Sequence, residues 1–280
     1  MRFKLYISAL SALLIFSTYM YLQSAGLLTS IPETVRLESI IPYNRMSSGG
    51  LASRFSEILG DRLVERTNVI RLQGCVIEYF RTEENNSVQV GFCRGEFRFL
   101  SYTNLAKISL RGFTSDVPSS VALLLKELSG DPYVTADFIL DVGGDGGLSK
   151  IYRGYQAYRG QRILASGYLV EWGLEDDVAN SITLFDVYRL PLIQRPLPKP
   201  NFEKVMAMIY EYGFTGFTYE EPHLQGLKIC GGKPMYSLRV VAEQSPLHGY
   251  EALIDAYTGE VYLLIGLSAL GVYRVWERTC

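Results

Sequence analysis

The stretch Lys233–Leu264 constrains the fold most strongly, because it contains three strand-like runs, the first two joined by a polar loop at Glu243–Gly249 and the last two by a turn. In the first run, Tyr236–Val241, large apolar side chains alternate with polar ones, which is the pattern of a strand with one buried face. Two further apolar runs follow, and Gly259 lies between them. Glycine can adopt the positive φ that a tight turn needs. The stretch therefore predicts a meander of three antiparallel strands.

The turn Asp255-Ala256-Tyr257-Thr258-Gly259-Glu260-Val261 resembles the PepSY family, whose modules end in Asp-Ala-x-Thr-Gly-Glu-Val. The resemblance covers residues 201–267, about the last quarter of the chain. It implies a module that acts without catalysis, binding or restraining a protease or another envelope protein. Polar and aromatic side chains of this sheet could meet an extended segment of that partner. The expected partner-binding residues are Tyr236, Arg239, Tyr250 and Tyr257.

A second, shorter resemblance lies upstream, in the run Gln156-Ala157-Tyr158-Arg159-Gly160-Gln161-Arg162-Ile163. It is similar to the Gln-x-Tyr-x-Gly-x-x-Val hairpin in propeptides of thermolysin-like proteases, which a PepSY module follows. The sequence contains no His-Glu-x-x-His, so we expect the catalytic protease domain to be absent. The motif lies within a hairpin that the strand-like runs predict over Ile151–Trp172.

A helix followed by strands recurs three times, which indicates an α+β fold of tandem helix-plus-antiparallel-meander modules, PepSY/cystatin-like, after an N-terminal transmembrane helix. Asp116 and Asn201 are expected N-caps, while Gly130 and Gly213 are expected to end their helices. The predicted divisions are 1–28 (membrane anchor or signal segment), 29–50 (stalk), 51–114 (first module), 115–190 (second module), 191–200 (proline-rich linker) and 201–280 (PepSY-like module).

Within the first two modules, helical spacing of apolar residues predicts a helix over Leu51–Arg66 and another over 116–130. The polar run Glu83–Ser87 is expected at a hairpin tip. The predicted strands are Val69–Phe80, Val88–Leu100, Ala106–Phe113, Tyr133–Leu140, Ile151–Tyr158, Ile163–Trp172 and Ile182–Tyr188. The apolar run Val261–Trp276 is expected to be a buried strand with an end segment.

The N-terminus carries a targeting segment. Arg2 and Lys4 precede Leu5–Leu22, an uncharged run of 18 residues. As a helix this run would be roughly 27 Å long, close to the hydrocarbon thickness of a bilayer. A single-pass anchor is the preferred interpretation, and a cleaved signal peptide with its site near Ser24-Ala25-Gly26 is the alternative. Either way the basic end stays in the cytoplasm, and the bulk of the chain lies outside the cytoplasm or is secreted.

Four cysteines in an oxidising compartment favour disulfides over metal. Folding the first hairpin about residue 84 places Cys75 opposite Cys93, so the sequence predicts a disulfide between them. Cys230 and Cys280 could form a second pair or remain free thiols.

The sequence gives no sign of catalytic chemistry. The formal net charge is −2, so no basic surface for nucleic acid is expected. The two histidines, His223 and His248, are expected to be solvated loop residues, and Asp141–Gly147 a flexible connection instead of a calcium loop. We therefore expect no enzyme, cofactor or metal. The alternative to a binding or regulatory protein is a structural subunit of a cell-surface layer or filament.

Overall fold

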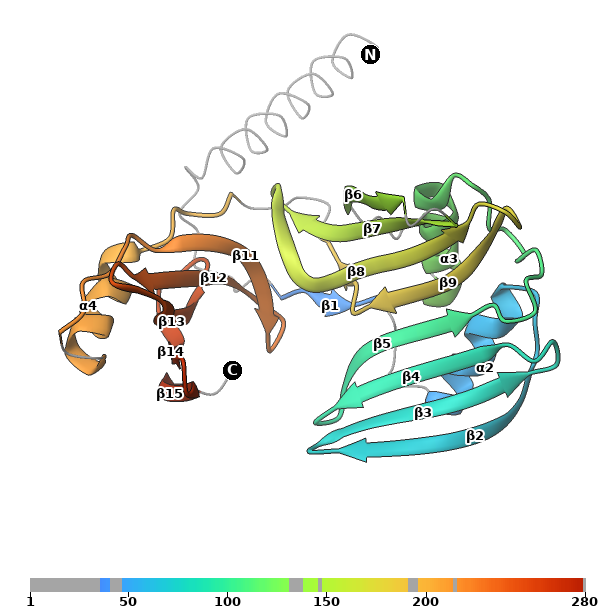
Figure 1. Cartoon of the computed structure of the whole chain (residues 1–280), viewed down its shortest axis with the longest axis horizontal. Helices are drawn as coiled ribbons and strands as arrows, with labels where there is room; N and C mark the ends of the chain where they lie inside the picture. Colours follow the sequence, from blue (N-terminus) through green and yellow to red (C-terminus); the bar gives the residue numbers. More distant parts are fainter. Residues whose placement is uncertain are drawn as a thin grey trace, which may run out of the picture. The chain divides into compact units, whose positions relative to one another are not determined.

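The computed structural model describes residues 36–40, 47–130, 138–145, 148–190, 196–213 and 216–278. These residues form a mostly β-sheet protein with few helices (Figure 1). They belong to two compact units, Leu37–Leu190 and a second unit that contains Pro191–Cys280.

The predicted anchor, 1–28, lies outside the described residues. Among the residues that are described, no helix is long and apolar enough to cross a membrane.

The unit Leu37–Leu190 contains a long antiparallel sheet and two helices. Neighbouring strands pair in the order β2-β3-β4-β5-β9-β8-β7-β6. A short ladder of β1 and β10 accompanies this sheet. The elements are β1 (Glu38–Ser39), α2 (Ser48–Ile58), β2 (Leu63–Leu72), β3 (Cys75–Thr82), β4 (Ser87–Cys93), β5 (Glu96–Thr103), α3 (Val117–Ser129), β6 (Phe138–Asp145), β7 (Ser149–Tyr158), β8 (Gln161–Gly173), β9 (Val178–Phe185) and β10 (Tyr188–Arg189).

The segments predicted as two successive modules share one sheet, because β5 pairs with β9. Helices α2 and α3 both lie behind the sheet in the view of Figure 1. One core joins side chains from both segments, among them Phe55 from α2, Leu125 from α3 and Trp172 from β8. The ring of Phe55 packs edge-on against Tyr102 of β5, with centroids 6.3 Å apart.

The helix predicted over Leu51–Arg66 is shorter in the structure, because α2 ends at Ile58. Gly60 follows with φ of +86°, a conformation that does not continue a helix. Leu63, expected on the helix, instead begins β2. The β-branched residues after it fit a pleated strand better than a helix.

Two of the predicted strands, Val69–Phe80 and Val88–Leu100, each contain a hairpin turn. Gln73 and Gly74 both have positive φ and separate β2 from β3, and Arg94 and Gly95 do the same between β4 and β5. Two-residue hairpins of this kind need a residue that tolerates the left-handed region, here followed by glycine. The hairpin tip predicted at Glu83–Ser87 lies between β3 and β4 as expected.

The predicted strand Ala106–Phe113 is wrong, because this segment forms turns and irregular backbone. The edge of β5 that it would occupy is taken by β9. Side chains satisfy its backbone instead: Ala106 N donates to Asn86 Oδ1 (2.9 Å), and Asn104 Nδ2 donates to Ile108 O (2.7 Å).

The flexible connection predicted at Asp141–Gly147 is also wrong as far as Asp145, where β6 pairs with β7. The second predicted helix was placed correctly. Asp116 caps α3 by accepting a hydrogen bond from Ser119 N, and Gly130 ends the helix with φ of +68°.

The second unit is one helix and a five-stranded antiparallel meander. Asn201 Oδ1 accepts a hydrogen bond from Lys204 N (3.1 Å) and so caps α4, as predicted. The elements are α4 (Phe202–Tyr212), β11 (His223–Cys230), β12 (Lys233–Ala242), β13 (Ser245–Asp255), β14 (Val261–Ser268) and β15 (Gly271–Glu277). The three predicted strands correspond to β12, β13 and β14, but the long loop expected at residues 243–249 is only a two-residue turn.

Candidate functional site

The turn between β13 and β14 is held by the side chains that the sequence singled out. Asp255 Oδ1 accepts hydrogen bonds from Tyr257 N and Thr258 N, each at 2.9 Å. Thr258 Oγ1 accepts one from Glu260 N (3.3 Å), and Gly259 has φ of +68°. These hydrogen bonds satisfy backbone N–H groups of the turn itself. Asp255 and Thr258 therefore stabilise the turn.

Two of the four residues expected to bind a partner are buried. Tyr236 is 4% exposed, and its hydroxyl donates a hydrogen bond to Pro198 O, which fixes the linker. Tyr250 is 0% exposed. Arg239 is exposed and Tyr257 is half-buried. The structure therefore does not bring the four side chains together on one surface.

Tyr250 belongs to an aromatic cluster between α4 and the sheet. Tyr219 packs edge-on against it with centroids 5.5 Å apart, and Tyr210 of α4 packs against Tyr219 at 6.2 Å. Burial, followed by a hydrogen bond with Tyr250, raises the pKa of Tyr219 above its ordinary value. Tyr273 of β15 has its pKa raised by the same two causes. The phenols of Tyr219 and Tyr273 therefore stay neutral at physiological pH.

The last strand, β15, has exposed apolar side chains and ends the strand order of the described sheet. Val272 is 70% exposed and Trp276 41%, and Leu270 in the turn before the strand is 101% exposed. Tyr212 at the end of α4 is 48% exposed and stacks on Trp276, with centroids 6.2 Å apart and ring planes at 29°. The sequence interpretation missed this surface because it treated the run as buried. The sequence signal for an exposed strand was the set of charged residues around Trp276, which are Arg274, Glu277 and Arg278.

Both histidines lie on strands and not in the loops expected for them. His223 begins β11 and lies 3.4 Å from Glu220 Oε2. His248 is in β13, where Nδ1 lies 2.9 Å from Ser245 Oγ and the ring stacks on Phe217 at 5.2 Å. Within the described ranges, no group of three His, Cys, Asp or Glu side chains could hold a metal ion.

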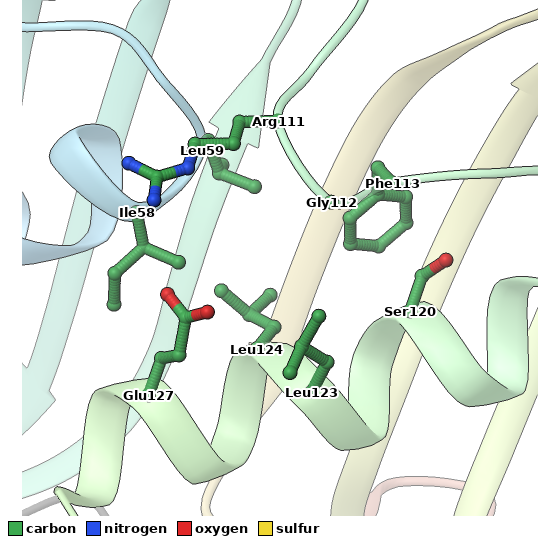
Figure 2. Close-up of a pocket in the computed structure, with 9 residues that line it drawn as sticks. All are labelled: Ile58, Leu59, Arg111, Gly112, Phe113, Ser120, Leu123, Leu124 and Glu127. Atoms are coloured by element: carbon green, nitrogen blue, oxygen red, sulfur yellow. The ribbon is translucent and has the colours of Figure 1, made fainter.

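A cavity of about 250 Å³ opens between the ends of α2 and α3 (Figure 2). Leu59 and Leu124 in its lining are 1% and 3% exposed and belong to the core, while Leu123 is 46% exposed. Figure 2 shows Arg111 from the loop and Glu127 from α3 among the nine lining residues. Those two are the only ionisable lining groups, of opposite charge, so the cavity lacks the convergent polar groups of a small-molecule site.

A buried carboxylate organises the end of the first sheet. Asp61 is 5% exposed, and its Oδ2 accepts hydrogen bonds from Tyr102 Oη (2.8 Å) and Asn86 Nδ2 (3.0 Å). Burial alone raises the pKa of Asp61, but hydrogen bonds from Thr82, Asn86, Tyr102 and the backbone of Arg62 outweigh it and leave that pKa below its usual value. An anion held by this many donors is structural.

The cysteines follow the sequence prediction where they are described. Cys75 and Cys93 lie opposite each other in the β3–β4 ladder and form a disulfide, with Cα atoms 3.9 Å apart. Cys230 is also disulfide-bonded. Cys280, the other half of the second predicted pair, lies outside the described residues.

The fold and these sites define a class, an α+β protein whose antiparallel sheets carry helices on one face. No family model matches the chain, and no curated protein matches it. Among solved structures it is similar to the C-terminal domain of YpeB from Bacillus megaterium, with 12% identity, a TM-score of 0.33, and coverage of 80% of this chain and 98% of that one. A similarity of this size does not establish a shared fold, and the PepSY resemblance continues to rest on Asp255–Val261.

Proposed function

We propose that this protein is a membrane-held, extracytoplasmic binding module that captures an extended segment of an envelope protein or protease and has no catalytic centre. The observation that carries the proposal is the exposed apolar edge at β15. An edge strand presents unpaired backbone N–H and C=O groups, which an extended peptide can continue as a further strand. The occupant we infer is therefore an extended polypeptide segment.

Strand β2, an edge of the sheet in the Leu37–Leu190 unit, carries more charge. Strand β2 pairs with β3 through two irregularities and exposes Glu65, Arg66 and Arg71. Bulges and charges are the usual protection against strand addition. The ion pairs of β2, Glu65 with Arg81 and Arg66 with Glu78, have a counterpart in Arg274 with Glu277 of β15. What distinguishes β15 is the exposed Trp276, which can pack against a partner strand.

The stacked pair Tyr212 and Trp276 provides the side-chain part of this surface. Aromatic residues are enriched at the centres of protein interfaces because they bury much area at a low cost in conformational entropy. We infer that the segment pairs with β15 through its backbone and packs an apolar side chain on Trp276.

Membrane attachment and the outside location of the folded units are part of the proposal and rest on Arg2, Lys4 and Leu5–Leu22. Protease added to intact spheroplasts should digest the bulk of the chain while a cytoplasmic marker survives. Full protection of the chain, under conditions that digest a known outside marker, would contradict this location.

The partner claim is tested by recovering the tagged full chain from its own membranes and comparing three forms. The wild type should co-purify with one dominant protein. Val272→Lys together with Trp276→Glu should lose it, because charges disfavour strand addition and remove the apolar contact. Leu105→Lys, at a site that is 61% exposed in the other unit, should retain it. Equal recovery by all three forms would overturn the proposal.

The structural-subunit alternative uses the same edge for self-association. It predicts polymers that grow with protein concentration, whereas the binding module predicts a closed, small species at every concentration. Sedimentation of the purified chain over a dilution series separates the two.

A further inference from the structure

Strand β14 is apolar on both of its faces. On the face toward α4, Leu264 is 0% exposed. On the opposite face, Leu263, Ile265 and Leu267 are each half-buried. An antiparallel sheet with one covered face normally places polar residues on the other. The composition of β14 therefore suits a strand that becomes buried on both faces.

The register extends this observation across the sheet. Leu253 of β13 lies directly opposite Leu263, and both Val241 of β12 and Leu267 of β14 lie opposite Gly249. Residues directly opposite in an antiparallel pair point to the same face. We call this set the outer patch: Val241, Leu253, Leu263, Ile265 and Leu267.

The outer patch has limits that the structure shows. Helix α4 packs on the other face, where a Cβ added at Gly213 would lie 2.5 Å from Tyr250 Oη. Toward β11 the outer face is already closed, since Met235 is 0% and Ser237 3% exposed. The patch therefore occupies the β13–β14 half of the sheet.

A depression interrupts the patch at Gly249, which has no side chain to fill it. The cavity measures about 140 Å³, and Val241, Leu247 and Leu267 are among its lining residues. An aliphatic side chain from an opposing sheet could enter it. The surface thus has apolar side chains that project from it and a depression that can accept an apolar side chain.

Two charged groups beside the patch show what kind of occupant fits. Arg239 also lines the depression and lies directly opposite Glu251 across β12 and β13. Among the described residues, neither side chain is in an ion pair. Arg239 and Glu251 therefore place one cation and one anion beside the patch, and each can form an ion pair with a second molecule. A twofold rotation places such a pair against its own complement.

We propose that the outer patch is the contact between two copies of this chain, which stack their C-terminal sheets face to face about a twofold axis. Arg239 of each copy pairs with Glu251 of the other, and apolar side chains of the two patches interdigitate. Face-to-face packing of antiparallel sheets is a common way to bury such surfaces. The proposal does not depend on the β15 edge, which remains open at the side of the stacked sheets.

The test is sedimentation velocity on the full chain in a mild detergent over a range of concentrations. The wild type should form a reversible dimer. Arg239→Glu and Glu251→Arg should each place like charges together and weaken the dimer by about tenfold or more. The double variant, Arg239→Glu with Glu251→Arg, should restore it. Glu221→Arg, at an exposed site outside the patch, is the matched control and should dimerise as the wild type does.

The rescue makes the test specific, because a variant that merely fails to fold cannot be restored by a second charge reversal. Ile265→Lys should abolish the dimer while the circular dichroism spectrum stays that of a folded protein. A wild type that stays monomeric, or single charge reversals that leave the dimer unchanged, would overturn the proposal. A monomer that binds anionic vesicles through the patch would point to a lipid surface and would equally overturn it.

Discussion

Replacing Asp61 should destabilise the Leu37–Leu190 unit by an amount that the hydrogen bonds around it define. In addition to Tyr102 and Asn86, the carboxylate accepts a bond from Arg62 N at 2.8 Å. A hydrogen bond to a charged group contributes about 1.5–3 kcal/mol, and a buried donor left without a partner costs about 1–3 kcal/mol. Tyr102 and Asn86 can still bond to each other at 2.7 Å. We therefore expect Asp61→Ala to lower the free energy of unfolding by about 3–5 kcal/mol.

The assay follows this unit alone. The chain has two tryptophans, Trp172 in this unit and Trp276 in the other. In a Trp276→Phe background, the fluorescence of Trp172 during urea unfolding reports only on the unit that contains Asp61. The control is Asp176→Ala, whose side chain is 48% exposed in an ion pair, and which should change the unfolding free energy by less than about 1 kcal/mol.

The pH dependence has a defined sign. Because the pKa of Asp61 is lowered in the folded state, its stabilising contribution is complete above the unfolded value of about 4 and is lost as pH falls through the folded pKa. The difference between wild type and Asp61→Ala should therefore be constant from pH 7 to about pH 5 and shrink below about pH 4. A loss under about 1 kcal/mol at pH 7, or a difference that grows in acid, would refute this reasoning.

Three further perturbations test other parts of the fold by the same kind of measurement. Cys93→Ser opens the loop of 18 residues closed with Cys75 and should cost about 3 kcal/mol in the Trp172 assay; no change would contradict a disulfide in the exported protein. Gln156→Leu should cost about 2 kcal/mol, because the buried Oε1 accepts bonds from Ser166 Oγ and Tyr188 N. Gly259→Val should cost about 1–3 kcal/mol in the second unit, followed by Trp276 fluorescence, since φ of +68° resists a β-branched residue; an unchanged midpoint would argue against that turn.

Elements with local signals could be predicted from the sequence. Asp116 with Gly130, and Asn201 at the start of α4, are capping residues whose role depends only on neighbours in the chain. The Cys75–Cys93 pair followed from counting around a polar hairpin tip. The Asp255–Gly259 turn was recognised for the same reason, because its hydrogen bonds close within five residues.

Long-range pairing could not be predicted in this way. The edge of β5 pairs with β9, about 80 residues later in the chain. The sequence of Ala106–Phe113 contains no signal that this segment is excluded from the sheet. Tyr236 and Tyr250 were expected on a surface, yet alternation along a strand does not say which face a helix covers. Once α4 covers their face, both tyrosines are buried, while Tyr210, Tyr212 and Trp276 are exposed.

The central claim, that the β15 edge captures an extended segment of another protein, is tested most directly by site-specific photo-crosslinking in intact cells. A benzophenone amino acid replaces Tyr212, which stacks on Trp276 and lies on the face away from the outer patch. The account predicts one covalent adduct with a different envelope protein, lost when Val272→Lys is added. The same probe at Leu105 should give no such adduct. An adduct only with a second copy of this chain, or none from Tyr212, would contradict the claim.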